Sequence, residues 1–463
     1  MKYPFSNPFM CLLVLVLSFY GLSQEQAKPN IVLIIVDDAG YHDFGFQGSK
    51  TFKTPHIDAL AKSGIVFSQA YVTAAVCGPS RAGLITGRYQ QRFGFEENNV
   101  PGIMSKSGLT GDDMGLPTHL NTMADYMKNL GYTNGYIGKW HLGNANRYHP
   151  LKRGFDHFVG FRGGARSFYP YGPNNPLKKS ENRIEFGFEK YQEPTNYLTQ
   201  FFADEAIGFM GKNKSTPFFL TISFNAVHNP LEIDKNYKGQ FPELKGKRKK
   251  LANMTASLDA ACGRIFKFLE KEQIINNTLV IFINDNGGPT DANGASNYPL
   301  SGTKANHLEG GIRIPFIMSW PEIIDSNRNY NFPVSTLDIL PTIFSIGGGD
   351  LGSIQPLDGV NLMPFILGKN KNKPHQFLYW KKESRAAIRH KNWKLLRFPD
   401  RPAQLYDISN DISEQHDLAD KYPEIVKEMY KKLFEWEAEL ERPLWQLDRK
   451  WEVRAMERMD TYH

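Results

Sequence analysis

The sequence predicts an α/β fold in which a large mixed, mostly parallel sheet is sandwiched by helices and a smaller subdomain follows. Short apolar runs rich in β-branched residues alternate with helical patterns, which is typical of parallel strands covered on both faces. After the glycines at 347–349 the pattern changes to closely spaced short strands and one helix, which indicates an antiparallel sheet. The chain has 463 residues, of which 41% are hydrophobic, so a packed core is expected and disorder is not.

The elements are expected in the following order. Strands of the large sheet are predicted at 31–36, 132–137 (the weakest pattern), 218–224, 279–283 and 315–319. Helices are predicted at 55–63, 79–86, 119–130, 198–212, 250–272 and 337–346. The second part should contain strands at 377–380, 385–389, 393–397 and 404–408, then a helix at 422–441. We therefore expect a catalytic domain over 24–368 and a C-terminal subdomain over 369–463.

The first 23 residues have the pattern of a secretory signal peptide. An early lysine precedes an apolar run at 9–22, and Gly21 and Ser23 supply small residues where a signal peptidase would cut. Cys11 precedes most of the apolar run, so a lipoprotein cleavage site is not expected. No later stretch is long and apolar enough for a membrane span. The predicted protein is exported, periplasmic or secreted, and does not span a membrane.

Charge and cysteine content narrow the possible partners. The formal net charge is +7, part of which comes from the segment 235–250, interpreted here as a solvated loop that leads into a helix. Nucleic acid is not an expected partner, because the chain has an export signal and no recognition motif. Of three cysteines, only Cys77 and Cys262 would remain after signal removal. The predicted protein therefore depends on its core and a bound metal for stability.

The segment Cys77-Gly78-Pro79-Ser80-Arg81 predicts an anion site at a helix N-terminus. A proline two residues after the cysteine fits the first turn of a helix, where its missing N–H costs nothing. Free backbone N–H groups and the helix dipole favour an anion there. Arg81 lies one turn further on the same face, where its guanidinium can grip the same anion. The alternative is a buried cysteine before an ordinary helix.

Polar residues also follow several predicted strands, where open α/β sheets bind ligands. Asp37-Asp38 and Asp285-Asn286 offer hard oxygen ligands to Ca²⁺ or Mg²⁺, although each pair alone is also common in turns. Lys139 and His141 are two residues apart and would share one face of an extended segment. His228 follows the strand predicted at 218–224.

In this order, these motifs resemble the formylglycine-dependent (type I) sulfatases of the alkaline-phosphatase-like superfamily. The resemblance extends from residues 28–30 to 404–407 and includes segments at 54–60, 138–143, 226–230, 302–304 and 309–315. The family commonly has asparagine at the position of His56. We interpret His56 and Asp58 as residues that start a helix, not as catalytic residues.

The resemblance implies an alkaline-phosphatase-like core, one Ca²⁺ ion and a formylglycine (3-oxoalanine) made from Cys77 by a maturation enzyme. The implied metal ligands are Asp37, Asp38, Cys77, Asp285 and Asn286. In the implied mechanism the hydrated aldehyde at residue 77 attacks sulfur, and His141 later takes a proton to expel sulfate. Arg81, Lys139 and Lys304 would neutralise the sulfate. His228, together with Lys304, would protonate the departing alcohol.

The substrate is predicted to be a sulfated carbohydrate, either a polysaccharide or its oligosaccharides. A loop rich in basic and aromatic residues suggests a pocket rim for a second anionic group and a sugar ring: Arg147, Arg153, Arg162, Arg166, Phe168, Tyr169 and Tyr171. The alternative is that most of these residues serve the fold or lie in an exposed loop. The alternatives are an arylsulfatase, a phosphate or phosphonate monoester hydrolase of the same superfamily, and a glycan-binding protein with an inactive site.

Overall fold

The computed structural model describes residues 1, 28–100, 102–354 and 356–462. Apart from Met1, the predicted signal peptide, including Cys11, lies outside the described residues. Within the described part of the chain, no helix has both the length and the apolar character needed to cross a membrane.

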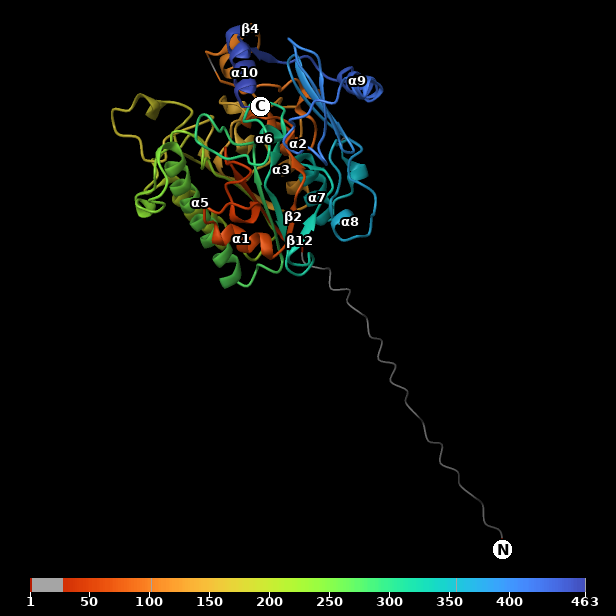
Figure 1. The fold of residues 1–463 in the computed structure, drawn as a ribbon. Coiled ribbons are helices and arrows are strands. Elements are labelled where there is room, and N and C mark those ends of the chain that lie inside the picture. Colours follow the sequence, from red (N-terminus) through yellow and green to blue (C-terminus); the bar gives the residue numbers. More distant parts are fainter. Residues whose placement is uncertain (2–27, 101, 355, 463) are drawn as a thin grey trace.

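The centre of the described chain is a nine-stranded sheet, as predicted mixed and mostly parallel (Figure 1). Its order is β12-β2-β11-β9-β1-β8-β5-β6-β7. The middle is formed by four parallel strands: β9 (Thr278–Asn284), β1 (Asn30–Val36), β8 (Phe218–Ser223) and β5 (Thr133–Lys139). In the middle of the sheet, Ile31 of β1 lies between Leu279 of β9 and Phe219 of β8.

The outer strands include several that the sequence pattern did not predict. They are β2 (Ile65–Phe67), β6 (His157–Phe161), β7 (Glu185–Phe186) and β12 (Arg328–Tyr330). The predicted strand at 315–319 is β11 (Phe316–Ser319), which runs antiparallel to β9 and β2. With two or three residues each, β2, β7 and β12 are too short to show a hydrophobic period, which explains why they were missed.

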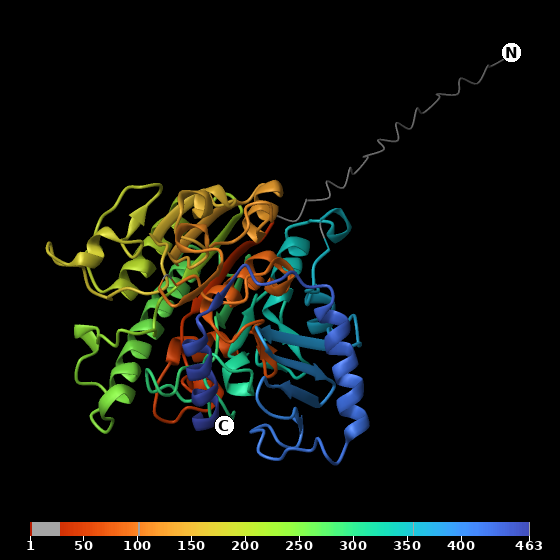
Figure 2. The ribbon, with the colours of Figure 1, turned by 90° about the horizontal axis from the view of Figure 1, so that it is seen from above.

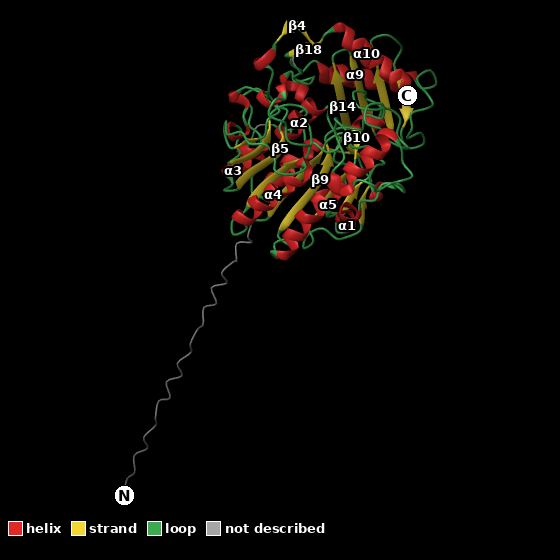
Figure 3. Ribbon diagram, turned by 90° about the vertical axis from the view of Figure 1, so that its left-hand side faces the viewer, coloured by secondary structure: helices red, strands yellow, loops and turns green. Residues whose placement is uncertain are grey.

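Two helical layers bury the two faces of this sheet, as predicted (Figure 3). One layer contains α1 (Pro55–Lys62), α4 (Leu198–Asn213) and α5 (Gly246–Lys271); the other contains α2 (Cys77–Thr86), α3 (Met123–Asn129) and α7 (Ile339–Ile346). Alternate residues of β1 divide between these layers, because successive strand side chains point to opposite faces. Val32 and Ile34 pack in the core beneath α4 and α5, whereas Ile31 and Leu33 pack beneath the second layer.

The start of α3 corrects the predicted helix at 119–130. The helix begins at Met123, because the Thr122 hydroxyl accepts a hydrogen bond from the Asp125 N–H while the Asp125 carboxylate accepts one from the Thr122 N–H. This capping box fixes the first turn four residues later than the apolar pattern suggested.

The C-terminal subdomain contains a four-stranded antiparallel sheet and a helix, as predicted (Figure 2). The elements are β14 (Phe377–Lys382), β15 (Arg385–His390), β16 (Trp393–Arg397), β17 (Gln404–Asp407) and α9 (Pro423–Glu437). Beyond α9 the chain forms β18 (Trp445–Leu447), paired with β4 (Met104–Gly108), and then α10 (Arg449–Tyr462). The sequence analysis missed these last elements.

A buried ion cluster joins the small sheet to α6 (Glu309–Ile312) of the catalytic domain. Lys394 of β16 contacts Glu309 at 2.9 Å and Glu414 at 2.8 Å, and all three side chains are fully buried. Glu309 starts α6, and its N–H donates to the Glu414 carboxylate at 2.6 Å. Burial and the nearby charge of Glu309 raise the pKa of Glu414 to about 7, even though Lys394 opposes this rise. Lys394 therefore pairs with both buried carboxyl groups, and Arg313 also pairs with Glu309 at 3.3 Å.

Lys394→Met should destabilise the protein strongly. The substitution keeps the packing volume but leaves the buried Glu414 carboxyl group without its cation and removes one of two cations from Glu309, so we expect the free energy of unfolding to fall by about 3–5 kcal/mol. Urea denaturation measures this change. Lys371→Met, at an exposed lysine, is the control and should leave the unfolding midpoint unchanged. Equal midpoints for the two variants would contradict a stabilising role for the cluster.

Candidate active site

Four central strands bring polar residues together at one edge of the sheet. Asp37 and Asp38 follow β1, Asp285 follows β9, Lys139 is the last residue of β5, and His228 lies in the loop after β8. Because these strands are neighbours and parallel, their carboxyl ends open onto the same space.

Two lysines neutralise the aspartates of β1. Lys139 Nζ donates to Asp37 Oδ2 at 2.6 Å, and Lys304 Nζ donates to both Asp38 oxygens at 2.6 and 2.8 Å. Lys304 also lies 3.1 Å from Cys77 Sγ. Burial alone would raise the pKa of Asp37, but neighbouring positive charges, led by Lys139, hold it well below its usual range. Both aspartates are therefore placed among cations.

Arg81 is held by three contacts. Its Nε donates to Asp285 at 3.0 Å, and one terminal nitrogen donates to the Lys139 carbonyl at 3.0 Å and to Ser223 Oγ at 2.5 Å. Burial opposes its charge, yet Asp285 raises the pKa of the guanidinium above its usual value. The guanidinium thus links the ends of β5, β8 and β9.

Cys77 is the first residue of α2, so the structure places its side chain at the helix N-terminus. All ten residues of α2 are buried. The thiol lies 3.5 Å from Asp37 Oδ1. Burial and the carboxylates of Asp285 and Asp37 raise the pKa of the thiol. The next backbone N–H, that of Gly78, donates to the side chain of Asn98 at 2.8 Å.

His141 presents an uncharged imidazole. Burial, together with the positive charges of Lys139 and Arg81, holds its pKa well below the usual value. Among the described residues, neither ring nitrogen has a hydrogen-bond partner. A Cβ atom at Gly164 would lie 2.7 Å from His141 Nε2, so only glycine allows this close approach. The ring is thus packed in place and has nitrogen atoms available for a ligand.

His228 is oriented by its own loop. Its Nδ1 lies 2.6 Å from the Asn229 carbonyl, and its Nε2 lies 3.5 Å from Asp38 Oδ2. Burial lowers its pKa, although Asp37 and Asp38 oppose this effect. The side chain is about one-fifth exposed and faces Cys77 across a cavity.

The carboxylate groups at this edge offer oxygen ligands to a metal ion. One ligand atom from each of Asp37, Asp38, Cys77 and His228 lies within 4.8 Å of the others. Nearby, Asn286 Nδ2 donates to Asp38 at 2.7 Å, while the Oδ1 atoms of Asp285 and Asn286 are buried and have no partner among the described residues. Burial and the charge of Asp37 raise the pKa of Asp285 to about 6, so a cation between these carboxylates would relieve their repulsion.

A cavity of about 260 Å³ opens onto Cys77, His141, His228 and Lys304. Its remaining walls carry amide and carboxylate side chains, with small residues between them: Asn98, Asn99, Val100, Asn144, Gly163, Gly164, Ala165, Glu181 and Asn182. The sequence analysis missed all of these residues, because they lie in loops without a recognisable motif.

The predicted basic and aromatic rim is wrong, because none of its seven residues lines this cavity. Three of the arginines are buried and committed elsewhere. Arg153 donates to the Leu116 carbonyl, Arg162 pairs with Glu185, and Arg166 pairs with Glu193.

The other four residues are also engaged away from the cavity. Arg147 is partly exposed and pairs with Asp113, and the Tyr169 hydroxyl donates to the Ile233 carbonyl. Phe168 and Tyr171 are buried.

The structural interpretation of His56 and Asp58 is confirmed. Asp58 accepts hydrogen bonds from the Phe46 N–H and the Thr54 hydroxyl, and the His56 N–H donates to Asp259. These contacts fix the start of α1.

Comparison with known proteins identifies several that this chain resembles. A family model described as Sulfatase matches residues 29–349, and a model described as N-sulphoglucosamine sulphohydrolase, C-terminal, matches 303–439. Steryl-sulfatase of Rattus norvegicus is 29% identical over 90% of this chain and 91% of its own length. N-acetylgalactosamine-6-sulfatase of Mus musculus is 32% identical over 81% of this chain and 74% of its own length.

Solved structures agree with these matches. The crystal structure of Ps i-CgsB in complex with k-i-k-neocarrahexaose has a TM-score of 0.85 and 36% identity, covering 94% of this chain and 99% of that one. The phosphonate monoester hydrolase of Agrobacterium radiobacter, with a TM-score of 0.66 and 20% identity over 89% of this chain and 95% of that one, shares the fold.

Asn98→Ala should loosen the N-terminus of α2. The substitution removes the acceptor of the Gly78 N–H, and loss of such a helix-end hydrogen bond costs about 1 kcal/mol of unfolding free energy. Urea denaturation checks this value. Asn99→Ala is the control, because the side-chain oxygen of Asn99 accepts no hydrogen bond from the described residues. An Asn98 variant no less stable than the Asn99 variant would contradict the expectation.

Proposed function

Because this chain belongs to the sulfatase family and is a sulfuric ester hydrolase, we propose that it cleaves a sulfate ester on a carbohydrate, a polysaccharide or its oligosaccharides. We further propose that it is exported, on the strength of the signal-peptide pattern in residues 1–23. The observation that carries the carbohydrate assignment is the 36% identity and near-complete overlap with a structure bound to neocarrahexaose.

The walls of the cavity support the same substrate class. Amide side chains both donate and accept hydrogen bonds, which suits the hydroxyl groups of a sugar. Four asparagines line the cavity, whereas no aromatic side chain does so among the described residues. A relative named N-acetylgalactosamine-6-sulfatase adds a second precedent for a sugar substrate.

A bound metal ion and a modification of Cys77 complete the proposed site. One Ca²⁺ would be held by Asp37, Asp38, Asp285, Asn286 and residue 77, and would supply positive charge to a sulfate oxygen. Oxidation of Cys77 to formylglycine by a maturation enzyme would supply, after hydration, the hydroxyl that attacks sulfur.

The positive side chains have different roles in binding sulfate. Lys304 lines the cavity and lies beside Cys77, so we assign it to direct contact with the sulfate. Arg81 and Lys139 do not line the cavity; they hold Asp285 and Asp37 in place and add positive charge behind the nucleophile. Fixed charges of this kind stabilise negative charge without rearranging during the reaction.

The two histidines have separate roles in moving protons at residue 77. His141 is neutral and its ring nitrogens lack partners, so it can accept the proton of a hydroxyl on residue 77. His228 lines the cavity and lies near Asp38 and Lys304, from where it can protonate the departing alcohol.

Three alternatives remain distinct from this proposal. A simple arylsulfatase would hydrolyse small aryl esters and spare saccharides. A phosphate or phosphonate monoester hydrolase would prefer the more highly charged ester, and the fold is shared with such an enzyme. A glycan-binding protein with an inactive site would bind saccharides and release no sulfate.

Sulfate release from a panel of sulfated mono-, oligo- and polysaccharides and an aryl sulfate tests the reaction and the substrate together. We expect release from at least one saccharide, and a loss of about three orders of magnitude or more for Cys77→Ala. Cys262→Ala is the matched control, because this second buried cysteine lies in α5, away from the site. Peptide mass spectrometry reports whether Cys77 carries the aldehyde. Turnover of the aryl or phosphate ester alone would overturn the carbohydrate assignment.

Calcium should stabilise the folded protein through the proposed ligands. A ligand that binds only the folded state at about 100 times its Kd adds about 2.7 kcal/mol of stability, so Ca²⁺ should raise the Tm and EDTA should reverse the rise. Asp285→Asn should weaken calcium binding measured by calorimetry, because it removes one carboxylate from the site. Asp325→Asn, at an aspartate 89% exposed, should not. Equal calcium affinity in both variants would exclude Asp285 as a ligand.

A further inference from the structure

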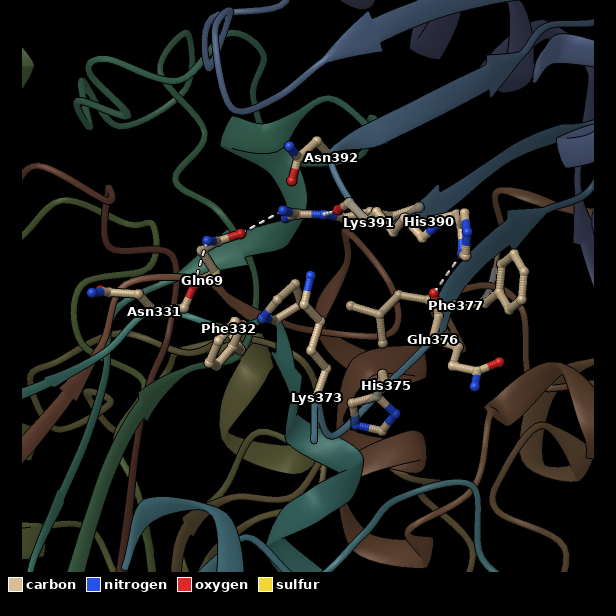
Figure 4. Close-up of a pocket in the computed structure, with 13 residues that line it drawn as sticks. Gln69, Asn331, Phe332, Lys373, His375, Gln376, Phe377, His390, Lys391 and Asn392 are labelled. Carbon is tan, nitrogen blue, oxygen red and sulfur yellow. Dashed lines mark hydrogen bonds between the residues drawn. The ribbon is translucent and has the colours of Figure 1, made fainter. Parts of the chain in front are cut away.

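A second cavity lies at the seam between the catalytic domain and the C-terminal sheet. It has a volume of about 460 Å³ and shares no lining residue with the cavity at Cys77. One wall comes from the loop 331–333 and Gln69, and the other from residues 373–378 and 389–392 (Figure 4).

The walls of this seam pocket are basic. Its ionisable lining residues are Lys373, His375, Arg389, His390 and Lys391, and none of its described lining residues is an aspartate or a glutamate. Arg389 is buried and occupied by Gln69 and Tyr71, and His375 faces Asp338 at 2.8 Å. By contrast, Lys373 and Lys391 are exposed and contact no carboxylate among the described residues. These two lysines provide uncompensated positive charge at the pocket mouth.

An aromatic surface lies beside these charges. Phe332 is 41% exposed, an unusual position for a phenylalanine, and Lys373 Nζ lies 5.6 Å from the centre of its ring. Figure 4 shows both side chains in the middle of the pocket. On the opposite wall His390 stacks on Phe377, with ring centres 4.3 Å apart. A ligand that suits this pocket combines an apolar face for the ring with anionic groups for the lysines.

The seam pocket is connected to the active site by a single strand. At one end of β15, Arg385 donates to the carbonyl of Ala305, the neighbour of Lys304. At its other end, Arg389 and His390 line the seam pocket. From Arg385 to His390 the strand advances five residue steps, a span of about 17 Å. One end of β15 therefore contacts the loop that carries Lys304, and the other end forms part of the seam pocket.

We propose that the seam pocket is a non-catalytic binding site for a sulfated saccharide chain, with Lys373 and Lys391 on its sulfate groups and Phe332 under a sugar ring. The choice of a sulfated saccharide as the ligand rests on the proposed carbohydrate substrate. The positive charge and the exposed ring of the pocket are independent of that proposal. The site holds polymer near the catalytic cavity and takes no part in bond cleavage.

Binding of dextran sulfate to a Cys77→Ala background tests the proposal without turnover. The variants are the double substitution Lys373→Ala/Lys391→Asn and the single substitution Phe332→Ala. All three residues are exposed, and asparagine suits residue 391, whose φ is 54°. The matched control is Lys421→Ala/Lys431→Ala at exposed lysines of the α9 region, where Lys421 also lies over a ring, that of Tyr422, at 5.3 Å.

We expect the double variant to bind dextran sulfate at least tenfold more weakly than its parent or the control at equal salt, with uncharged dextran bound by none of them. With Cys77 restored, KM for a polymeric substrate should rise while kcat, and turnover of a small aryl sulfate, stay unchanged. Unchanged dextran sulfate binding by the double variant would overturn the proposal. So would equally strong, Lys373-dependent binding of poly-glutamate, which would assign the pocket to acidic polypeptides.

The outcomes separate this site from the proposed function. Lysine-dependent binding of dextran sulfate without sulfate release from any saccharide would support the seam pocket and overturn the carbohydrate substrate. Sulfate release from a saccharide, with no effect of the lysine substitutions on dextran sulfate binding or KM, would support the carbohydrate substrate and overturn the seam pocket.

Discussion

The structure depends on the mutual compensation of buried charges at the carboxyl edge of the large sheet. Asp37, Asp285, Arg81 and Lys139 are each at most 2% exposed, and none could be buried alone at acceptable cost. Their contacts with one another join the ends of three strands, β1, β9 and β5, to α2, and Arg81 adds β8 through Ser223. The same arrangement supplies both halves of the proposed chemistry, since the carboxylates attract a metal ion and the cations favour an anionic ester.

Much of this edge was predictable because it follows from strand order. A run of apolar residues that ends in Asp37-Asp38, or in Asp285-Asn286, places those residues at a known end of a strand. The cavity walls were not predictable in this way. Asn98, Asn144 and Asn182 come from loops whose paths depend on tertiary contacts, and nothing in their local sequence distinguishes them from ordinary loop residues.

The error over the basic and aromatic rim has a specific cause. Sequence shows that Arg162 and Arg166 are positive, but it does not show that Glu185 and Glu193 lie beside them. A charged side chain can be assigned to a ligand only after its ion-pair partners within the protein are known. Likewise, Thr122 and Asp125 fixed the start of α3 through a reciprocal hydrogen-bond pair that outweighed the apolar pattern before it.

The C-terminal subdomain also holds part of the active site in position. The loop that carries Lys304 is held by β15 through Ala305, by Ser413 through Ser301 and by Glu414 through Glu309. Displacement of the small sheet would therefore move a lysine that touches Cys77.

The burial of α2 also constrains the order of events in biosynthesis. Cys77 is 1% exposed, and every other residue of its helix is covered by the rest of the fold. The neighbouring cavity, of about 260 Å³, admits a small ligand but not a protein that has to hold the chain on both sides of the thiol. A modifying enzyme that requires such a hold would reach Cys77 only in the extended chain, before β1, β9 and the small sheet assemble around it.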